Sequence, residues 1–133
     1  MEVSAKASYI RISPRKVRLV IDVIRGLDVA QAREQLRFMN KAAARPVMKL
    51  LDSAVANAEH NFHFLADRLF VKRIVADMGP TLHRWTPKAF GRSAPIRKRT
   101  SHVAIALAER ASQPEVPRRK RPAKSGARLT PQK

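Results

Sequence analysis

The sequence predicts an α+β domain, in which a small three-stranded antiparallel sheet packs against three helices and carries a long protruding β-hairpin. Apolar and polar residues alternate in three segments, at residues 2–12, 69–77 and 101–109. Three segments with apolar residues at helical spacing lie between the first two, and a basic segment rich in turn residues separates the last two. We therefore expect a single domain over residues 1–111, with its hairpin at 78–100, and a basic, proline-rich C-terminal tail at 112–133.

The first strand leads directly into the first helix. In the strand, the alternation predicts one shared face for Val3, Ala5, Ala7 and Tyr9. Ser13 and Pro14 are typical of an N-cap and a first helical residue, and Gly26 is typical of a helix end. The apolar side of this helix is expected to consist of Val17, Val20, Ile21 and Ile24.

Two further helices follow. Asp28 can cap the second, where Gln31 would complete a capping box. Its apolar side is expected to be Val29, Ala32, Leu36 and Met39. The third helix is expected from about residue 41 to 60, and Pro46 should either kink it or mark its start. Its apolar stripe is Ala44, Val47, Met48, Leu51, Ala54, Val55 and Ala58. Core packing accounts for all three stripes, so none of them requires a cofactor.

The segment 78–100 connects the last two strands and has no core of its own. It contains six basic side chains and no carboxylate, and after Met78 its only large apolar residues are Leu82, Trp85, Phe90 and Ile96. If its flanking strands pair antiparallel, about ten residues per arm at ~3.3 Å each would carry the tip ~30 Å away from the sheet. A two-stranded hairpin is marginal alone in water, so we expect a partner to hold it. The alternative is a disordered loop.

The charge of the chain points to that partner. Lys and Arg number 28 against 10 Asp and Glu, which gives a net charge of +18 and a pI near 11.7. Residues 1–79 contain 14 basic and 8 acidic side chains, whereas residues 80–111 and 112–133 each contain seven basic and one acidic. This excess is larger than solubility requires, and it favours binding to a nucleic acid.

Several classes of protein are disfavoured by what the sequence lacks. There is no cysteine, which excludes disulfides and cysteine-based zinc sites. No apolar run approaches the ~18 residues of a membrane span, and the N-terminus does not resemble a signal peptide, so we expect a cytoplasmic protein. We find no phosphate-binding glycine loop and no acid–base pair, and expect neither enzymatic activity nor a cofactor. His60 and His63 beside Glu59 could suggest a metal, but a helix end is a loose platform for one, so we expect none.

Three sets of residues are candidates for contacts with RNA. Arg15, Lys16 and Arg18 begin the first helix, where a bound phosphate would meet both cations and helical N–H groups. Asn57, His60 and Asn61 end the third helix and could reach ribose hydroxyls or base edges, although Asn61 could instead cap the helix. In the hairpin, basic residues are interleaved with the rings of His83, Trp85 and Phe90, which can stack on unpaired bases. The alternative for each basic set is a solvated surface.

Short motifs distributed over about residues 3–107 resemble one family. They are Ser13-Pro14-Arg15-Lys16-Val17-Arg18, Ile24-Arg25-Gly26, the segment from Ser53 to Asn61, Asp77-Met78-Gly79-Pro80, Arg84, Pro87, Ala89, Gly91-Arg92, Ile96, and Lys98-Arg99-Thr100-Ser101-His102. In this order and spacing the chain resembles the bacterial type of large-subunit ribosomal protein twenty-two. His83 departs from the pattern, since members often carry Lys there, and the tail lies outside it.

The resemblance implies a structural constituent of the large ribosomal subunit that binds 23S-type ribosomal RNA and supports assembly. Neighbouring ribosomal proteins would be further partners. The globular part would lie near the peptide exit, and the hairpin would line the exit tunnel beside the nascent polypeptide. Its tip would be Pro87, Lys88, Ala89, Phe90, Gly91 and Arg92. The expected RNA-binding residues are Arg11, Ser13, Arg15, Lys16, Arg18, Asn57, His60, Asn61, Arg84, Lys88, Arg92, Arg97, Lys98, Arg99, Thr100, Ser101, His102, Arg118, Arg119, Lys120 and Arg121.

Two alternatives compete with this interpretation. The second and third helices could form a helix-turn-helix that binds DNA, but the connection between them lacks the short glycine-containing turn. The outer face of the third helix is also nearly neutral, whereas a helix that reads the major groove should be basic. A small RNA-processing enzyme is the other alternative, and the lack of a catalytic cluster argues against it.

Overall fold

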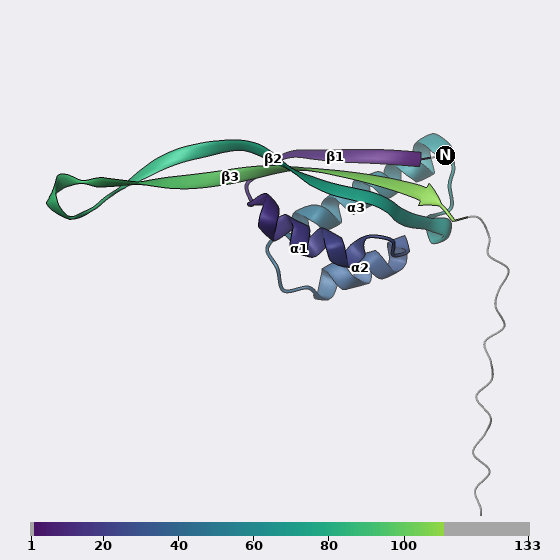
Figure 1. Ribbon diagram of the computed structural model, residues 1–133. Helices are drawn as coiled ribbons and strands as arrows, with labels where there is room; N and C mark the ends of the chain where they lie inside the picture. The colour runs from purple at the N-terminus through teal and green to yellow at the C-terminus, as the bar shows by residue number, and fades with distance from the viewer. Residues whose placement is uncertain (1, 111–133) are drawn as a thin grey trace, which may run out of the picture.

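The computed structural model describes residues 2–110. It contains three helices and three strands, together with 3-10 turns at Ala66–Arg68 and Ala89–Gly91. In chain order the main elements are β1 (Glu2–Ile10), α1 (Pro14–Ile24), α2 (Val29–Phe38), α3 (Ala44–Phe62), β2 (Leu69–Pro87) and β3 (Ser93–Glu109). The helices lie on one side of the sheet, and the far parts of β2 and β3 extend beyond them as a two-stranded ribbon (Figure 1). The predicted fold class is confirmed.

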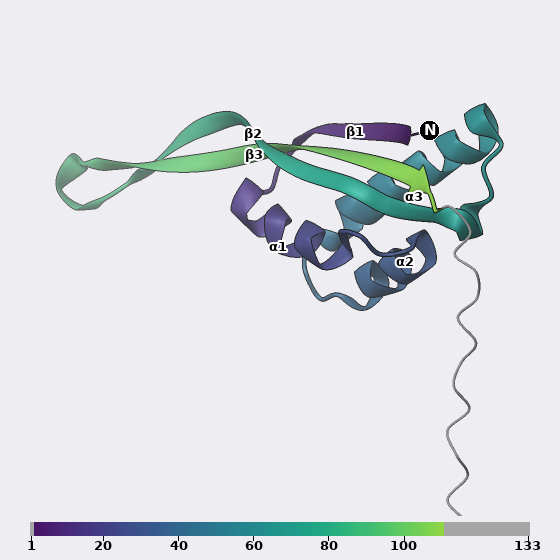
Figure 2. The same ribbon diagram turned by 45° about the vertical axis from the view of Figure 1, so that its right-hand side comes forward.

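The sheet is antiparallel, with the strand order β1-β3-β2. β1 pairs with one part of β3, from Glu2 opposite Ala108 to Ile10 opposite Ser101. β2 pairs with β3 along its whole length, to the last pair at Pro87 and Ser93. Past the end of β1, β2 and β3 pair only with one another. This stretch is the protruding hairpin, which Figure 2 shows from a second direction.

The core lies between the sheet and the helices. In β3 the buried residues Val103, Ile105 and Leu107 alternate with partly exposed ones, as the sequence pattern predicts. The apolar stripes of the helices are buried as well, with Met39 and Met48 partly covered at the margin. Each helix thus buries one face, because α3 packs against β1, α1 packs against β2, and α2 packs against α3.

Tyr9 is an exception to the predicted alternation in β1. Its side chain is 66% exposed, and its φ of 59° is in the left-handed region, next to a shift of the strand register between Ala7 and Ile10. A bulge adds a residue to one strand and turns the following side chain, so the period of two stops there. The Tyr9 ring instead contacts the ring of His102 edge-on, with centroids 4.8 Å apart.

The helix ends also differ from the prediction. Ser13 and Asp28 precede their helices, but neither side chain makes a capping hydrogen bond, so the predicted capping box is absent. α3 begins at Ala44, which places Pro46 in the first turn, where a missing N–H costs no helical hydrogen bond. At the other end, His63 is the C-cap in the left-handed region, so the alternative role of Asn61 as the cap is wrong.

Candidate nucleic-acid interface

A basic groove lies where the hairpin leaves the globular body. Its volume is about 780 Å³, and three parts of the chain line it: the start of α1 with the residues before it, the α2–α3 connection, and the base of the hairpin. The lining residues are Arg11, Ile12, Ser13, Lys16, Ala42, Leu82, Arg84, Arg97, Lys98, Arg99 and Thr100. Six of these side chains are cationic and none is a carboxylate, and residues up to 89 positions apart in the sequence, Arg11 and Thr100, meet here.

The strand register brings the hairpin cations together. Leu82 lies opposite Lys98, and Arg84 lies opposite Ile96 and beside the pair of His83 and Arg97. Because neighbouring strands in a sheet are only about 4.8 Å apart, the cations of both strands share a short stretch of ribbon. The twist of a two-stranded ribbon is larger than that of a wide sheet, so consecutive residues of one strand can border the same groove.

Within residues 2–110, the cations of the groove have no carboxylate partner. Across residues 2–110, ion pairs within 4.0 Å connect Asp22, Asp28, Asp52, Glu2 and Glu109 to other basic residues, and none of them involves the six groove cations. The Arg84 guanidinium donates to the carbonyl of His83, at 3.1 Å. Like charges gathered in this way repel one another, and a bound polyanion would reverse that repulsion. The groove is therefore suited to a phosphate backbone.

The start of α1 contributes side chains rather than backbone donors. Pro14 has no N–H, and the N–H of Lys16 donates to the Ser13 carbonyl at 3.0 Å. The helix end therefore offers an anion few free N–H groups, contrary to the expectation from its sequence. Lys16 lines the groove together with Arg11 and Ser13, whereas Arg15, although exposed, does not.

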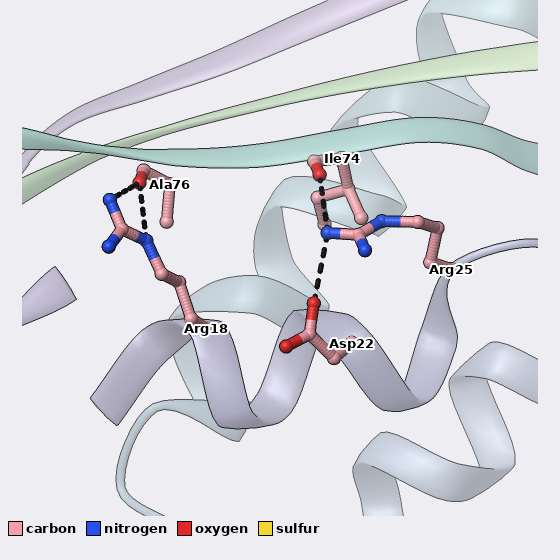
Figure 3. Close-up of polar contacts among 5 residues, drawn as sticks. All are labelled: Arg18, Asp22, Arg25, Ile74 and Ala76. Atoms are coloured by element: carbon pink, nitrogen blue, oxygen red, sulfur yellow. Dashed lines mark hydrogen bonds and ion pairs between the residues drawn. The ribbon is translucent and has the colours of Figure 1, made fainter. Parts of the chain in front are cut away.

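Arg18 has a structural contact that the sequence did not predict. Its Nε and Nη2 donate to the carbonyl of Ala76 at 3.2 and 3.0 Å, and Arg25 donates from its Nη2 alone to the carbonyl of Ile74 at 3.3 Å (Figure 3). β2 is an edge strand, so these carbonyls have no neighbouring strand. The Asp22 carboxylate forms an ion pair with the same Arg25 nitrogen, at 2.9 Å. The two arginines thus connect α1 to the sheet edge.

Thr100, Ser101 and His102 also bind within the protein. The Thr100 hydroxyl donates to the Pro80 carbonyl at 2.6 Å, and the Ser101 hydroxyl donates to the Ile12 carbonyl at 2.9 Å. Both residues are buried, Ser101 completely. His102 Nδ1 accepts a hydrogen bond from the backbone N–H of Tyr9 at 3.1 Å. These side chains therefore hold the base of the hairpin, and their contacts with RNA stay a prediction.

The tip of the hairpin lies at the far end of the ribbon from the groove. The strands end at Pro87 and Ser93, and a 3-10 turn at Ala89–Gly91 joins them. The Lys88 N–H donates to the Arg92 carbonyl at 2.8 Å, which closes the turn. Phe90, with a φ of 57°, is 99% exposed. The turn therefore presents one aromatic ring between two cationic side chains.

The candidates at the end of α3 do not join the groove. Asn57 is partly buried, and His60 and Asn61 are exposed near the C-terminal end of the helix. The groove adjoins the other end of α3, by way of the α2–α3 connection. In residues 2–110 no group of three potential metal ligands is close enough to hold an ion. Arg118, Arg119, Lys120 and Arg121 lie outside the described residues.

The sequence did not predict that apolar residues would line the groove together with the cations. Ile12, Ala42 and Leu82 lie among the cations, and each belongs to a different part of the chain. No local pattern distinguishes them, because they come together only when the sheet and the helices pack.

No helix in the described part of the chain is long and apolar enough to cross a membrane.

Comparison with known proteins identifies the family. The sequence profile of the family Ribosomal protein L22p/L17e matches residues 5–108. Large ribosomal subunit protein uL22 of Deinococcus radiodurans is 54% identical over 109 residues, which cover 82% of this chain and 81% of the relative. The protein of the same name from Thermus thermophilus is 53% identical over 110 residues, covering 83% of this chain and 97% of the relative. The chain therefore belongs to the L22p/L17e family of ribosomal proteins.

Proposed function

We propose that this protein is a structural constituent of the large ribosomal subunit, in the cytoplasm, and that it binds the RNA of that subunit through the basic groove at the hairpin base. The observation that carries the proposal is the meeting of six cations and no carboxylate in one groove lined by three parts of the chain. Family membership supports it, since the relatives are named as proteins of the large ribosomal subunit.

In this mechanism the protein acts by binding and carries out no reaction. The groove neutralises phosphates of a folded RNA. The bond from Thr100 to Pro80 keeps the two strands of the hairpin base in register, and the bond from Ser101 to Ile12 holds β3 to the segment before α1. Neutralisation of phosphates releases counterions, which lowers the cost of bringing RNA helices together and so supports subunit assembly. Neighbouring ribosomal proteins would complete the surroundings of the globular body.

The hairpin tip is proposed to border the tunnel through which the nascent polypeptide leaves. The exposure of Phe90 and the length of the paired ribbon support this role. A photo-crosslinking residue in place of Phe90, in ribosomes stalled with a nascent chain, should crosslink to that chain, whereas one in place of Leu19 on α1 should not. Crosslinking from both positions or from neither would contradict the proposed place of the tip.

Salt dependence of RNA binding tests the role of the groove. If six phosphates are neutralised at ~0.7–0.9 per contact, the groove contributes about −4 to −5 to the log–log slope of affinity against salt. The double variant Arg97→Gln/Lys98→Gln should bind large-subunit RNA more weakly, with a slope less negative by about 1.4–1.8.

The matched control removes two charges elsewhere. Lys6 and Lys49 are exposed cations outside the groove, so Lys6→Gln/Lys49→Gln changes the net charge equally. Equal losses of affinity in the two double variants would show that only net charge matters and would refute the groove. The affinity for duplex DNA of matched length should be measured as well. We expect the protein to bind this DNA much more weakly than it binds large-subunit RNA.

The structure adds a reason to reject the helix-turn-helix alternative. On α3, the exposed Lys49 is accompanied by the acidic Asp52 and Glu59, and Asp52 already pairs with Arg33 of α2 at 2.7 Å. A helix that enters the major groove of DNA needs a basic outer face. Six cations line the groove at the hairpin base instead.

A further inference from the structure

A second pocket lies on the connection between α2 and α3. Its volume is about 750 Å³, within the range of ligand pockets, and it is lined by the end of α2, the connection and the start of α3. The lining residues are Leu36, Arg37, Phe38, Met39, Asn40, Lys41, Ala42, Ala44, Arg45 and Met48. Ala42 also lines the basic groove, so the two sites adjoin.

Phe38 is the unusual residue of this pocket. It is the last residue of α2, and its side chain is 85% exposed, although most apolar side chains of the helices are buried. In the described part of the chain, no other ring and no cation stacks on it. A single exposed apolar residue is common on protein surfaces, so its meaning depends on the chemistry around it.

The surroundings of Phe38 are cationic. Arg37, Lys41 and Arg45 line the same pocket, and none of them has a carboxylate partner within 4.0 Å in residues 2–110. One turn earlier on α2, by contrast, Arg33 is neutralised by Asp52. The pocket itself contains no carboxylate. A protein partner with an apolar anchor would not require three unpaired cations, whereas a nucleotide offers both a flat base and a phosphate.

The connection is held in place before any ligand binds. The N–H of Lys41 donates to the Met39 carbonyl at 2.9 Å, and the N–H of Ala44 donates to the Lys41 carbonyl at 3.0 Å. Ala43 is buried in the core and anchors the middle of the connection. A site whose backbone is already ordered loses less entropy when a ligand binds.

From these observations we propose that the pocket is a binding site for one unpaired nucleotide of RNA. The base stacks on the Phe38 ring, and the flanking phosphates lie against Arg37, Lys41 and Arg45. Stacking on an aromatic ring accepts any base, so the site recognises single-stranded RNA by its form rather than its sequence. The proposal rests on the proposed function, since the RNA strand that fills the groove is the one expected to continue past Ala42.

The test compares affinities of full-length variants for transcribed large-subunit RNA. Phe38→Ala should lower the affinity by about 5- to 150-fold, the loss expected for one stacked base, while leaving the salt slope unchanged. Phe38→Tyr keeps a ring and should bind as the unchanged protein does. Lys41→Gln should instead make the slope less negative by about 0.7. Circular dichroism checks that each variant is folded, as expected for exposed side chains.

Leu19→Ala is the matched control, because Leu19 is 63% exposed on α1 and lies outside the pocket. If Phe38→Ala binds RNA as tightly as Leu19→Ala does, the proposal is wrong, and the pocket would instead bind a neighbouring protein. Equal weakening by Phe38→Ala and Phe38→Tyr would also refute stacking. The proposed function fails separately, if Arg97→Gln/Lys98→Gln has no effect on affinity.

Discussion

Gly79 at the hairpin base gives the sharpest test of how the hairpin is attached to the body. A Cβ added there would overlap Thr100 Oγ1, and it would lie 3.1 Å from His102 Nε2 and 3.3 Å from the Thr100 backbone carbon. These atoms cannot move away freely, because Thr100 is buried and β-branched and its hydroxyl donates to Pro80. Gly79 is therefore required for the close approach of the two strands and not for a special φ.

The expected cost of Gly79→Ala follows from three contributions. Overpacking of a tight site costs about 1–3 kcal/mol. Displacement of the Thr100 hydroxyl removes a hydrogen bond worth about 1 kcal/mol. The reduced freedom of alanine in the unfolded chain returns about 0.4–1 kcal/mol. Since the last two nearly cancel, the free energy of unfolding should fall by about 1–3 kcal/mol, as measured by urea denaturation of the full chain.

A double-mutant cycle decides whether the contact with Thr100 is the cause. Thr100→Ala removes the overlapping atom, so Gly79→Ala should cost at least about 1 kcal/mol less in that background. Gly91→Ala in the tip is the control, because its added Cβ meets nothing within 4 Å and should show no coupling to Thr100. Equal costs of Gly79→Ala with and without the Thr100 side chain would refute the reasoning.

Two further predictions concern the body. Arg18→Gln removes the two hydrogen bonds to the Ala76 carbonyl on the edge of β2. Because Arg18 is exposed, the free energy of unfolding measured by urea denaturation should fall by only about 1 kcal/mol. An unchanged free energy would show that the arginine is not needed to cover the strand edge. The hydrogen bond and charge of Lys72 lower the pKa of Glu2. This pair therefore stabilises the fold at pH values above the ordinary pKa of a glutamate, and the stabilisation is lost as the pH falls through the lowered pKa. The midpoint of the Glu2 carboxyl in an NMR titration should therefore rise in Lys72→Gln, and a midpoint that stays in place would contradict the assignment of the cause.

Local patterns in the sequence were sufficient for the elements and the fold class. The helical spacing of Val17, Val20 and Ile24 and the alternation of Val103 and Ile105 each reflect burial of one face, and such periods can be read from neighbouring residues alone. The turn of the hairpin, at Ala89–Gly91, likewise falls within the segment expected for its tip. In these places the residues that decide the structure are close together in the chain.

The sequence alone was least informative where one side chain had several possible partners. Ser13 and Asp28 have the right types for helix caps, but neither forms a capping bond, and Asp28 pairs with Arg110 instead. From the sequence, Arg18 is predicted to be a free cation. Only the position of β2 at the sheet edge shows that it contacts the Ala76 carbonyl. A polar side chain takes its partner from whatever packing brings within reach.

Composition and pattern by themselves determined that this is a small α+β protein with a strongly basic hairpin, because charge and periodicity are properties of the chain as written. The tertiary structure decided which of its cations act together. Arg11, Lys16 and Arg97 belong to one groove only because α1 packs beside the base of β3, and the Thr100 hydroxyl beside them is engaged by its bond to Pro80. Such a groove is a juxtaposition of distant segments, and its physical cause is burial of a shared core.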